Sequence, residues 1–208
     1  MSDTTHRALR LALASLLAAA MVAQLAIGMS RNDLTVVRFF SSFNVLSNTF
    51  AAVMLALLAF RPDRDNAQGF AALRGAVTVY MSVTGLVYAL IMAPEAANVG
   101  LTEPWVDWSL HVIGPIAIAL DWLVDAPRVR LPSNSPAIWL AFPAAYLVYT
   151  LIRGPIAEWY PYPILDPGEV DGYRGVALWS FVVLAVIVGF GLVYHWWANR
   201  RSPRPQVA

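Results

Sequence analysis

Six apolar stretches dominate the chain, and short polar segments separate them. They cover residues 11–29, 39–60, 75–93, 108–124, 137–152 and 175–197. About 20 apolar residues cross the hydrocarbon core of a bilayer as a helix. Runs rich in Ala and Leu, without alternation of period two, favour helices over a β-barrel. The pattern predicts an all-α membrane protein: a six-transmembrane-helix bundle formed by one polytopic domain over residues 1–208, in which the short fourth and fifth stretches borrow flanking residues.

The first stretch has an alternative interpretation. Arg7 and Arg10 precede a run of Ala and Leu, as in a cleavable secretory signal. The run continues to Met29, however, and exceeds the apolar region of about 7–15 residues that signal peptides carry. We therefore expect an uncleaved first helix.

Composition supports the membrane assignment and excludes several classes of function. The chain is 59% hydrophobic and 13% charged, and of its 27 charged residues only Asp121 falls inside an apolar stretch. The absence of Cys excludes disulfides, thiolate metal sites and a cysteine nucleophile. A net charge of +1 gives no basic surface for nucleic acid. We expect membrane lipids as partners, with no cofactor and no metal.

Arginine distribution predicts the orientation. With the N-terminus inside, ten Arg residues fall in cytoplasmic segments and four in outer segments, a bias typical of cytoplasmic loops. Both termini are then cytoplasmic. The outer loop 94–107 carries three acids and no basic residue, and aromatic residues gather at the outer boundary. The Pro-rich segment Trp159–Pro167 should form a stiff, non-helical flap there, or only an interfacial anchor.

The second stretch carries a polar stripe. Ser41, Asn44 and Asn48 follow a spacing of i, i+3 and i+7, and Ser47 lies three residues after Asn44. Small polar residues of this kind face other helices. They act either as interhelical hydrogen bonds or as part of a site.

The fourth stretch carries a histidine at similar depth. His111 lies four residues after Asp107, so the two share a helix face and Asp107 can fix the imidazole tautomer. At 1.5 Å per residue, His111 and Asn44 both fall in the outer half of the membrane, which predicts a shared site. A structural role for His111 is the alternative. Asp121 lies about 15 Å deeper, where we expect it to pair with Arg128 or to close an inner vestibule.

Four segments also resemble a known family. Phe39–Asn48, His111–Pro115 with Asp121 and Trp122, Tyr149–Gly154, and Tyr160–Pro163 resemble the signatures of bacterial six-pass membrane proteins related to the eukaryotic androgen-induced and androgen-dependent membrane hydrolases, which are fatty-acid ester hydrolases. The resemblance spans most of the chain and implies a multi-pass protein of the bacterial plasma (inner) membrane.

The family resemblance implies an intramembrane Thr nucleophile and a His base that hydrolyse esters of branched fatty acids. The family His falls on His111, whereas the family Thr falls on Asn44, and a carboxamide cannot form an ordinary acyl-enzyme. Either Ser41 or Ser47 takes the nucleophile's role, or the chain does not hydrolyse by that route. The candidate substrate-binding residues are Asn48, Arg153, Tyr160 and Tyr162.

Two functions follow from these observations. The first is an intramembrane hydrolase of lipid esters, with His111 as base and Asn44 or Asn48 donating to the oxyanion. The second is a non-catalytic membrane binder or carrier of a small amphiphile that keeps the same outer-leaflet polar pocket.

Overall fold

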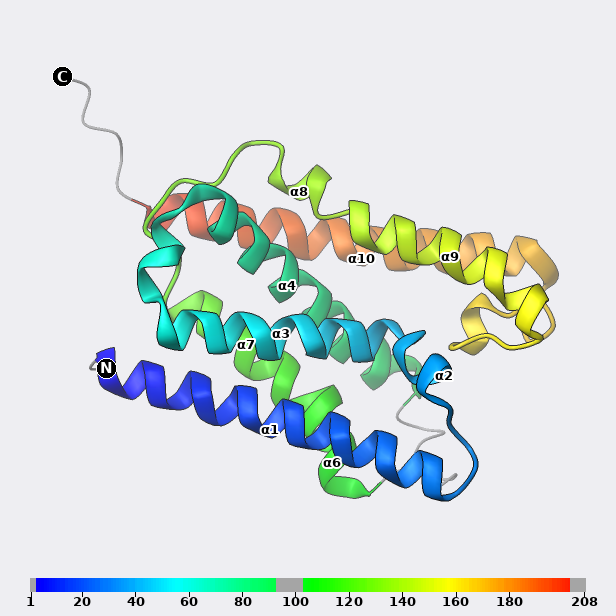
Figure 1. The fold of residues 1–208 in the computed structure, drawn as a ribbon. Helices are drawn as coiled ribbons and strands as arrows, with labels where there is room; N and C mark the ends of the chain where they lie inside the picture. Colours follow the sequence, from blue (N-terminus) through cyan, green and yellow to red (C-terminus); the bar gives the residue numbers. More distant parts are fainter. Residues whose placement is uncertain (1–2, 93–102, 203–208) are drawn as a thin grey trace.

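The computed structural model describes residues 3–92 and 103–202 as a bundle of helices (Figure 1). Six helical segments are long and apolar enough to cross a membrane, and the described residues contain no β-strand. The chain is a multi-pass membrane protein. The predicted all-α architecture with six spans is therefore confirmed for the described residues, which leave out residues 94–102 of the acidic loop that we predict to lie outside.

Several spans combine more than one helical element. The α-helices are α1 (Asp3–Ser30), α2 (Val36–Phe40), α3 (Phe43–Phe60), α4 (Gln68–Val87), α6 (Pro104–Trp108), α7 (Gly114–Val124), α8 (Ser135–Ile138), α9 (Ala141–Ala157) and α10 (Gly172–Arg201). A π-helical turn, Tyr88–Met92, extends α4, and a second one, Ser109–Ile113, joins α6 to α7. The fourth and fifth spans, Pro104–Val124 and Ser135–Ala157, do use flanking residues.

The helices pack around a core that runs along the bundle. In Figure 1, α1 lies beside α3, and the start of α1 and the end of α10 lie at the same end of the bundle. Helix α4 packs against α3, α7 and α10. Large apolar side chains on every span point outward instead, such as Val22 (70% exposed), Phe60 (70%) and Ile156 (79%). Such a surface suits contact with lipid.

The second stretch forms two helices rather than one, which corrects the predicted stripe. Helix α2 ends at Phe40, Ser41 caps it, and Ser42 is extended before α3 begins. The Tyr146 hydroxyl donates to the Ser41 carbonyl at 2.9 Å, so that carbonyl is satisfied outside a helix. Asn44, Ser47 and Asn48 therefore lie on α3, whereas Ser41 lies on the connection before it.

The flap is also more ordered than expected. Helix α9 ends at Glu158, which has a left-handed backbone (φ 48°), and the chain then turns back. A short 3₁₀ turn, Pro163–Leu165, interrupts the segment that we predicted to be non-helical. Ile164 and Leu165 are buried in an apolar cluster with Tyr146 and Val176, which anchors the flap to α9 and α10.

Asp121 does not pair with Arg128, contrary to the first of our two expectations. Its carboxylate binds Arg10 of α1 at 2.8 Å and Arg74 of α4 at 2.8 Å. Both guanidinium groups are buried, and the Arg74 guanidinium also lies over the Trp122 ring. The sequence did not indicate this pairing because Arg10 and Arg74 come from helices with no fixed spacing to Asp121.

Candidate functional site

His111 lies on the π-helical turn between α6 and α7, where Asp107 holds its ring. Its Nδ1 is 3.0 Å from Asp107 Oδ1 and 3.1 Å from the Asp107 carbonyl oxygen. Both side chains are largely buried, with 17% and 18% of their surfaces exposed. A carboxylate on one ring nitrogen fixes the orientation of an imidazole and leaves the other nitrogen available.

Asn44 reaches that second nitrogen. Its Nδ2 is 2.9 Å from His111 Nε2. Asn48 donates to Asn44 Oδ1 at 2.7 Å and to the Leu110 carbonyl at 3.2 Å, so the Asn44 oxygen is occupied and its nitrogen faces the imidazole. An amide nitrogen can only donate, so Nε2 accepts and Nδ1 carries the proton toward Asp107. The hydrogen bonds thus select one tautomer.

Tyr88 completes the surroundings of His111. Its ring is stacked on the imidazole with centroids 4.3 Å apart, and its hydroxyl donates to Asp107 Oδ2. Each oxygen of the Asp107 carboxylate therefore has a partner. The sequence analysis missed Tyr88 because it belongs to a different span, and no spacing rule links residues on separate helices. Its place at the end of the third apolar stretch was the only signal.

A close crossing of two helices brings Tyr88 to His111. A Cβ atom at Gly85 would lie 2.8 Å from Pro115 Cβ, so only glycine fits there without a shift. Pro115 has no N–H to donate to the carbonyl of His111, and Gly114 instead donates to the Ser109 carbonyl across five residues. A π-helical turn of this type is frequent at functional sites.

Tyr162 connects the flap to the site. Its hydroxyl oxygen accepts the backbone N–H of Asn44 at 3.0 Å, in the first turn of α3. Burial raises the pKa of Tyr162 to about 12, while hydrogen bonds from backbone N–H groups oppose that shift. The phenol therefore stays protonated at ordinary pH, and its proton is available to a neighbouring acceptor.

The two candidate serine nucleophiles do not contact His111. Ser41 Oγ donates to the Val37 carbonyl at 2.7 Å and is 3.1 Å from the Tyr149 hydroxyl. Ser47 Oγ is buried and has no hydrogen-bond partner among the described residues. Asn44 is therefore the side chain that occupies the position facing the base.

Two further candidates lie on the flap side of the bundle. The Arg153 guanidinium is 5.5 Å from the centre of the Trp159 ring. Tyr160 packs so closely on Gly154 that a Cβ there would fall 2.0 Å from the Tyr160 ring. No contact in the described part of the chain joins Arg153 or Tyr160 to Asn44 or His111, so their substrate-binding roles stay predictions.

A second polar cluster lies at the opposite end of the bundle. Arg74 pairs with Asp65 at 2.5 Å, and Arg10 pairs with Asp125 at 2.6 Å. Burial raises the pKa of Asp65, and the attraction of Arg74 only partly offsets it. Burial acts the same way on Asp125, but the hydrogen bond and charge of Arg10 outweigh it and lower the pKa of that carboxyl.

Neither a metal site nor a related protein was identified for the described part of the chain. Within residues 3–92 and 103–202, no group of three His, Asp or Glu side chains is arranged to hold a metal ion. Comparisons with protein-family models, curated proteins and solved structures found no match. The family resemblance therefore stays an interpretation of the motifs.

Proposed function

We propose that the outer site hydrolyses lipid esters, with His111 as general base and Asp107 as the group that fixes its tautomer. The observation that carries this proposal is the hydrogen-bond chain from Asp107 through His111 to Asn44. An imidazole with a carboxylate on one nitrogen and a hydrogen-bond donor facing the other is the arrangement that orients a base in acyl transfer.

Water is the attacking group in this proposal. Neither serine hydroxyl contacts His111, and Asn44 has no hydroxyl to offer. The water displaces the Asn44 N–H from His111 Nε2, and Nε2 then takes a proton from this water as the water oxygen bonds to the ester carbonyl carbon. The tetrahedral intermediate then expels the alcohol, which receives that proton from His111, and a fatty acid is left.

Asn44 donates a hydrogen bond to the oxyanion in this proposal. One hydrogen of its Nδ2 points at His111 Nε2, which leaves the second hydrogen for the ester carbonyl oxygen. Asn48 holds the amide in that orientation by donating to its oxygen. Loss of a single donor to an oxyanion costs about 10²–10³ in turnover, so the amide has a catalytic use even without a hydroxyl.

The surroundings favour a substrate with an apolar chain. The site belongs to a membrane-spanning segment. Tyr162 lies beside the backbone of Asn44 and packs in an apolar cluster that includes Phe43, Leu46 and Ile91. An acyl chain can lie against such residues while its ester group reaches the polar site.

Turnover of a fluorogenic long-chain ester by purified protein in detergent tests this proposal. His111→Ala should lower turnover by about 10²–10⁴-fold, and Asp107→Asn should lower it because the base loses its orienting carboxylate. His195→Ala is the matched control, because His195 lies near the end of α10 and hydrogen-bonds Asn199 instead. Equal turnover in His111→Ala and His195→Ala would reject the proposal.

One observation favours a second function. The Asn44 amide already occupies His111 Nε2, and this satisfied arrangement suits a protein that binds an amphiphile without cleaving it. In that case a long-chain ester binds to the wild type and to His111→Ala but is not turned over by either. Binding without turnover in the wild type would establish the carrier function in place of the hydrolase.

A further inference from the structure

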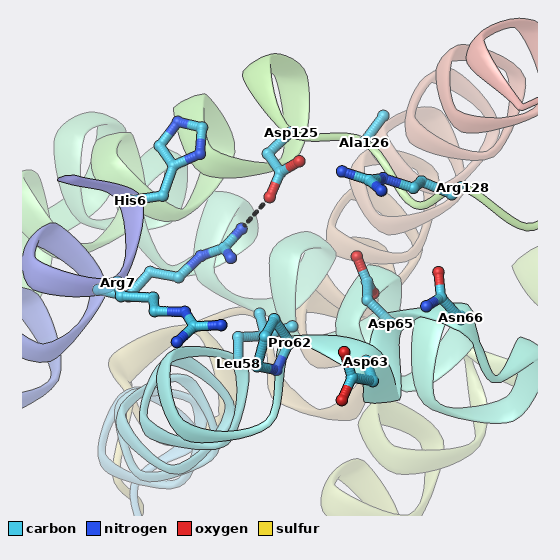
Figure 2. Close-up of a pocket in the computed structure, with 11 residues that line it drawn as sticks. His6, Arg7, Leu58, Pro62, Asp63, Asp65, Asn66, Asp125, Ala126 and Arg128 are labelled. Atoms are coloured by element: carbon cyan, nitrogen blue, oxygen red, sulfur yellow. Dashed lines mark hydrogen bonds and ion pairs between the residues drawn. The ribbon is translucent and has the colours of Figure 1, made fainter. Parts of the chain in front are cut away.

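A polar cavity of about 200 Å³ lies at the end of the bundle where α1 begins and α10 ends (Figure 2). Three spans begin or end beside it: the first begins at Thr4, the second ends at Phe60 and the fourth ends at Val124. The cavity therefore lies at the level where lipid headgroups meet the bundle. None of the residues that line it belongs to the outer site.

Charges of opposite sign face one another across this cavity. Figure 2 shows Arg7 on the α1 side and Asp63 and Asp65 on the opposite side, from the 3₁₀ turn Pro62–Asn66. Arg128, which follows α7, lies at the upper right in that view, on the same side as Asp65. Arg7, Arg128 and Asp63 form no ion pair in the described part of the chain, so their charges are available to a ligand.

Buried groups give the cavity a fixed frame. Arg10 lines it with only 6% of its surface exposed, and it is held by Asp121 and Asp125. Asp65 also lines it: Oδ2 binds Arg74, whereas Oδ1 is buried without a hydrogen-bond partner in the described residues. The exposed carboxylate of Asp63 can accept hydrogen bonds from an ammonium group, which supplies up to three donors.

We propose that this cavity binds the zwitterionic headgroup of a phospholipid with a primary ammonium, that is, phosphoethanolamine, independently of the function of the outer site. The phosphate lies between Arg7 and Arg128, and the ammonium lies toward Asp63 and Asp65. Guanidinium groups favour phosphate because their donors match its oxygens. The cavity offers side chains of both signs, and the zwitterionic headgroup carries one charge for each.

The walls also discriminate among related headgroups. A quaternary ammonium is recognised mainly by aromatic rings and cannot donate a hydrogen bond. No aromatic side chain other than the imidazole of His6 lines the cavity, which disfavours phosphocholine. A purely anionic headgroup, such as phosphoglycerol, would place no positive charge near Asp63 and Asp65.

Native mass spectrometry of the full chain tests the proposal. The protein is titrated with phosphatidylethanolamine, phosphatidylcholine and phosphatidylglycerol that carry identical acyl chains. We expect phosphatidylethanolamine to bind about tenfold more tightly than the other two, and Arg7→Ala or Arg128→Ala to weaken it about tenfold. Arg64→Ala is the matched control, because this exposed arginine lies on the same turn as Asp63 but does not line the cavity.

Asp63→Asn separates the two ends of the headgroup. It should weaken phosphatidylethanolamine and leave phosphatidylglycerol unchanged or bound more tightly, since only the ammonium needs the carboxylate. If free phosphoethanolamine displaces the lipid, the site recognises the headgroup alone. If the lipid stays bound, the site requires the intact lipid. Tightest binding of phosphatidylglycerol, equal binding of all three lipids, or equal losses in Arg64→Ala and Arg7→Ala would overturn the proposal.

Discussion

Tyr88 and His111 lie face to face, with their ring planes only 14° apart, although they come from different spans. The same tyrosine donates its hydroxyl to the carboxylate that holds His111. Tyr88 therefore fixes the imidazole twice, once through its ring and once through Asp107. Its position makes it a positioning residue, since it acts on the base rather than on a substrate.

Tyr88→Phe separates these two effects. The variant keeps the stacked ring and loses the hydrogen bond to Asp107, so ester turnover should fall about tenfold. Because the substrate is not touched, kcat should fall while KM stays near its wild-type value. Tyr88→Leu, which also removes the ring, should be slower still. A change confined to KM would place Tyr88 in substrate contact instead.

Gly85→Ala tests the close crossing that brings Tyr88 to His111. The added Cβ would lie 2.8 Å from the Pro115 ring, and overpacking of this kind costs about 1–3 kcal/mol. Gly189→Ala is the control, because a Cβ at Gly189 meets nothing within 4 Å and alanine favours a helix. Thermal unfolding in detergent should show a lower midpoint for Gly85→Ala and an equal or higher one for Gly189→Ala.

Stability should depend on pH in opposite ways at Asp65 and Asp125. The pKa of Asp125 is lowered in the folded state, so its contribution is present above the unfolded value near 4 and is lost as pH falls through the folded pKa. The pKa of Asp65 is raised, so its charged form costs stability, and stability is regained as pH falls through that pKa.

Two isosteric Asp→Asn variants test the direction of each pH dependence. At pH 7, Asp125→Asn should lower the thermal midpoint by about 2–4 °C, and the difference from wild type should shrink in acid. Asp65→Asn should leave the midpoint unchanged or raise it, because asparagine resembles the protonated acid. A lower midpoint for Asp65→Asn at pH 7 would mean that its ion pair with Arg74 outweighs the cost of burial.

The sequence predicted the spans well because their signal is local. A run of about 20 apolar residues has few alternatives in a membrane protein, and all six runs were found in order. The contact between Asp107 and His111 could also be predicted, because residues four apart on a helix lie on the same face. Asn44 was placed near His111 from its depth alone.

Features that depend on contacts between helices could not be predicted from the sequence. The break at Ser41 depends on the Tyr146 hydroxyl, which satisfies the Ser41 carbonyl from a distant helix. Of the two alternatives for Asp121, pairing with Arg128 was wrong, because Arg10 and Arg74 approach Asp121 from α1 and α4. Spacing along one helix cannot predict such contacts, since they depend on how the spans pack.

Topology is open to a direct test. The arginine bias predicts that both termini face the cytoplasm, and six spans require the two termini to lie on the same side. A reporter fused after Ala208 should be active inside, and one inserted in the loop 94–107 should be active outside. The reverse pattern would place the outer site at the cytoplasmic face and contradict the orientation.

Covalent labelling of Asn44→Thr tests whether His111 acts as a general base. The substitution places a hydroxyl opposite His111 Nε2, where the wild type has an amide. If His111 is a working base, a fluorophosphonate probe should label Asn44→Thr but not the wild type, and adding His111→Ala should abolish the label. Absence of labelling in a correctly folded Asn44→Thr protein, or labelling that persists without His111, would contradict the assignment of His111 as the base.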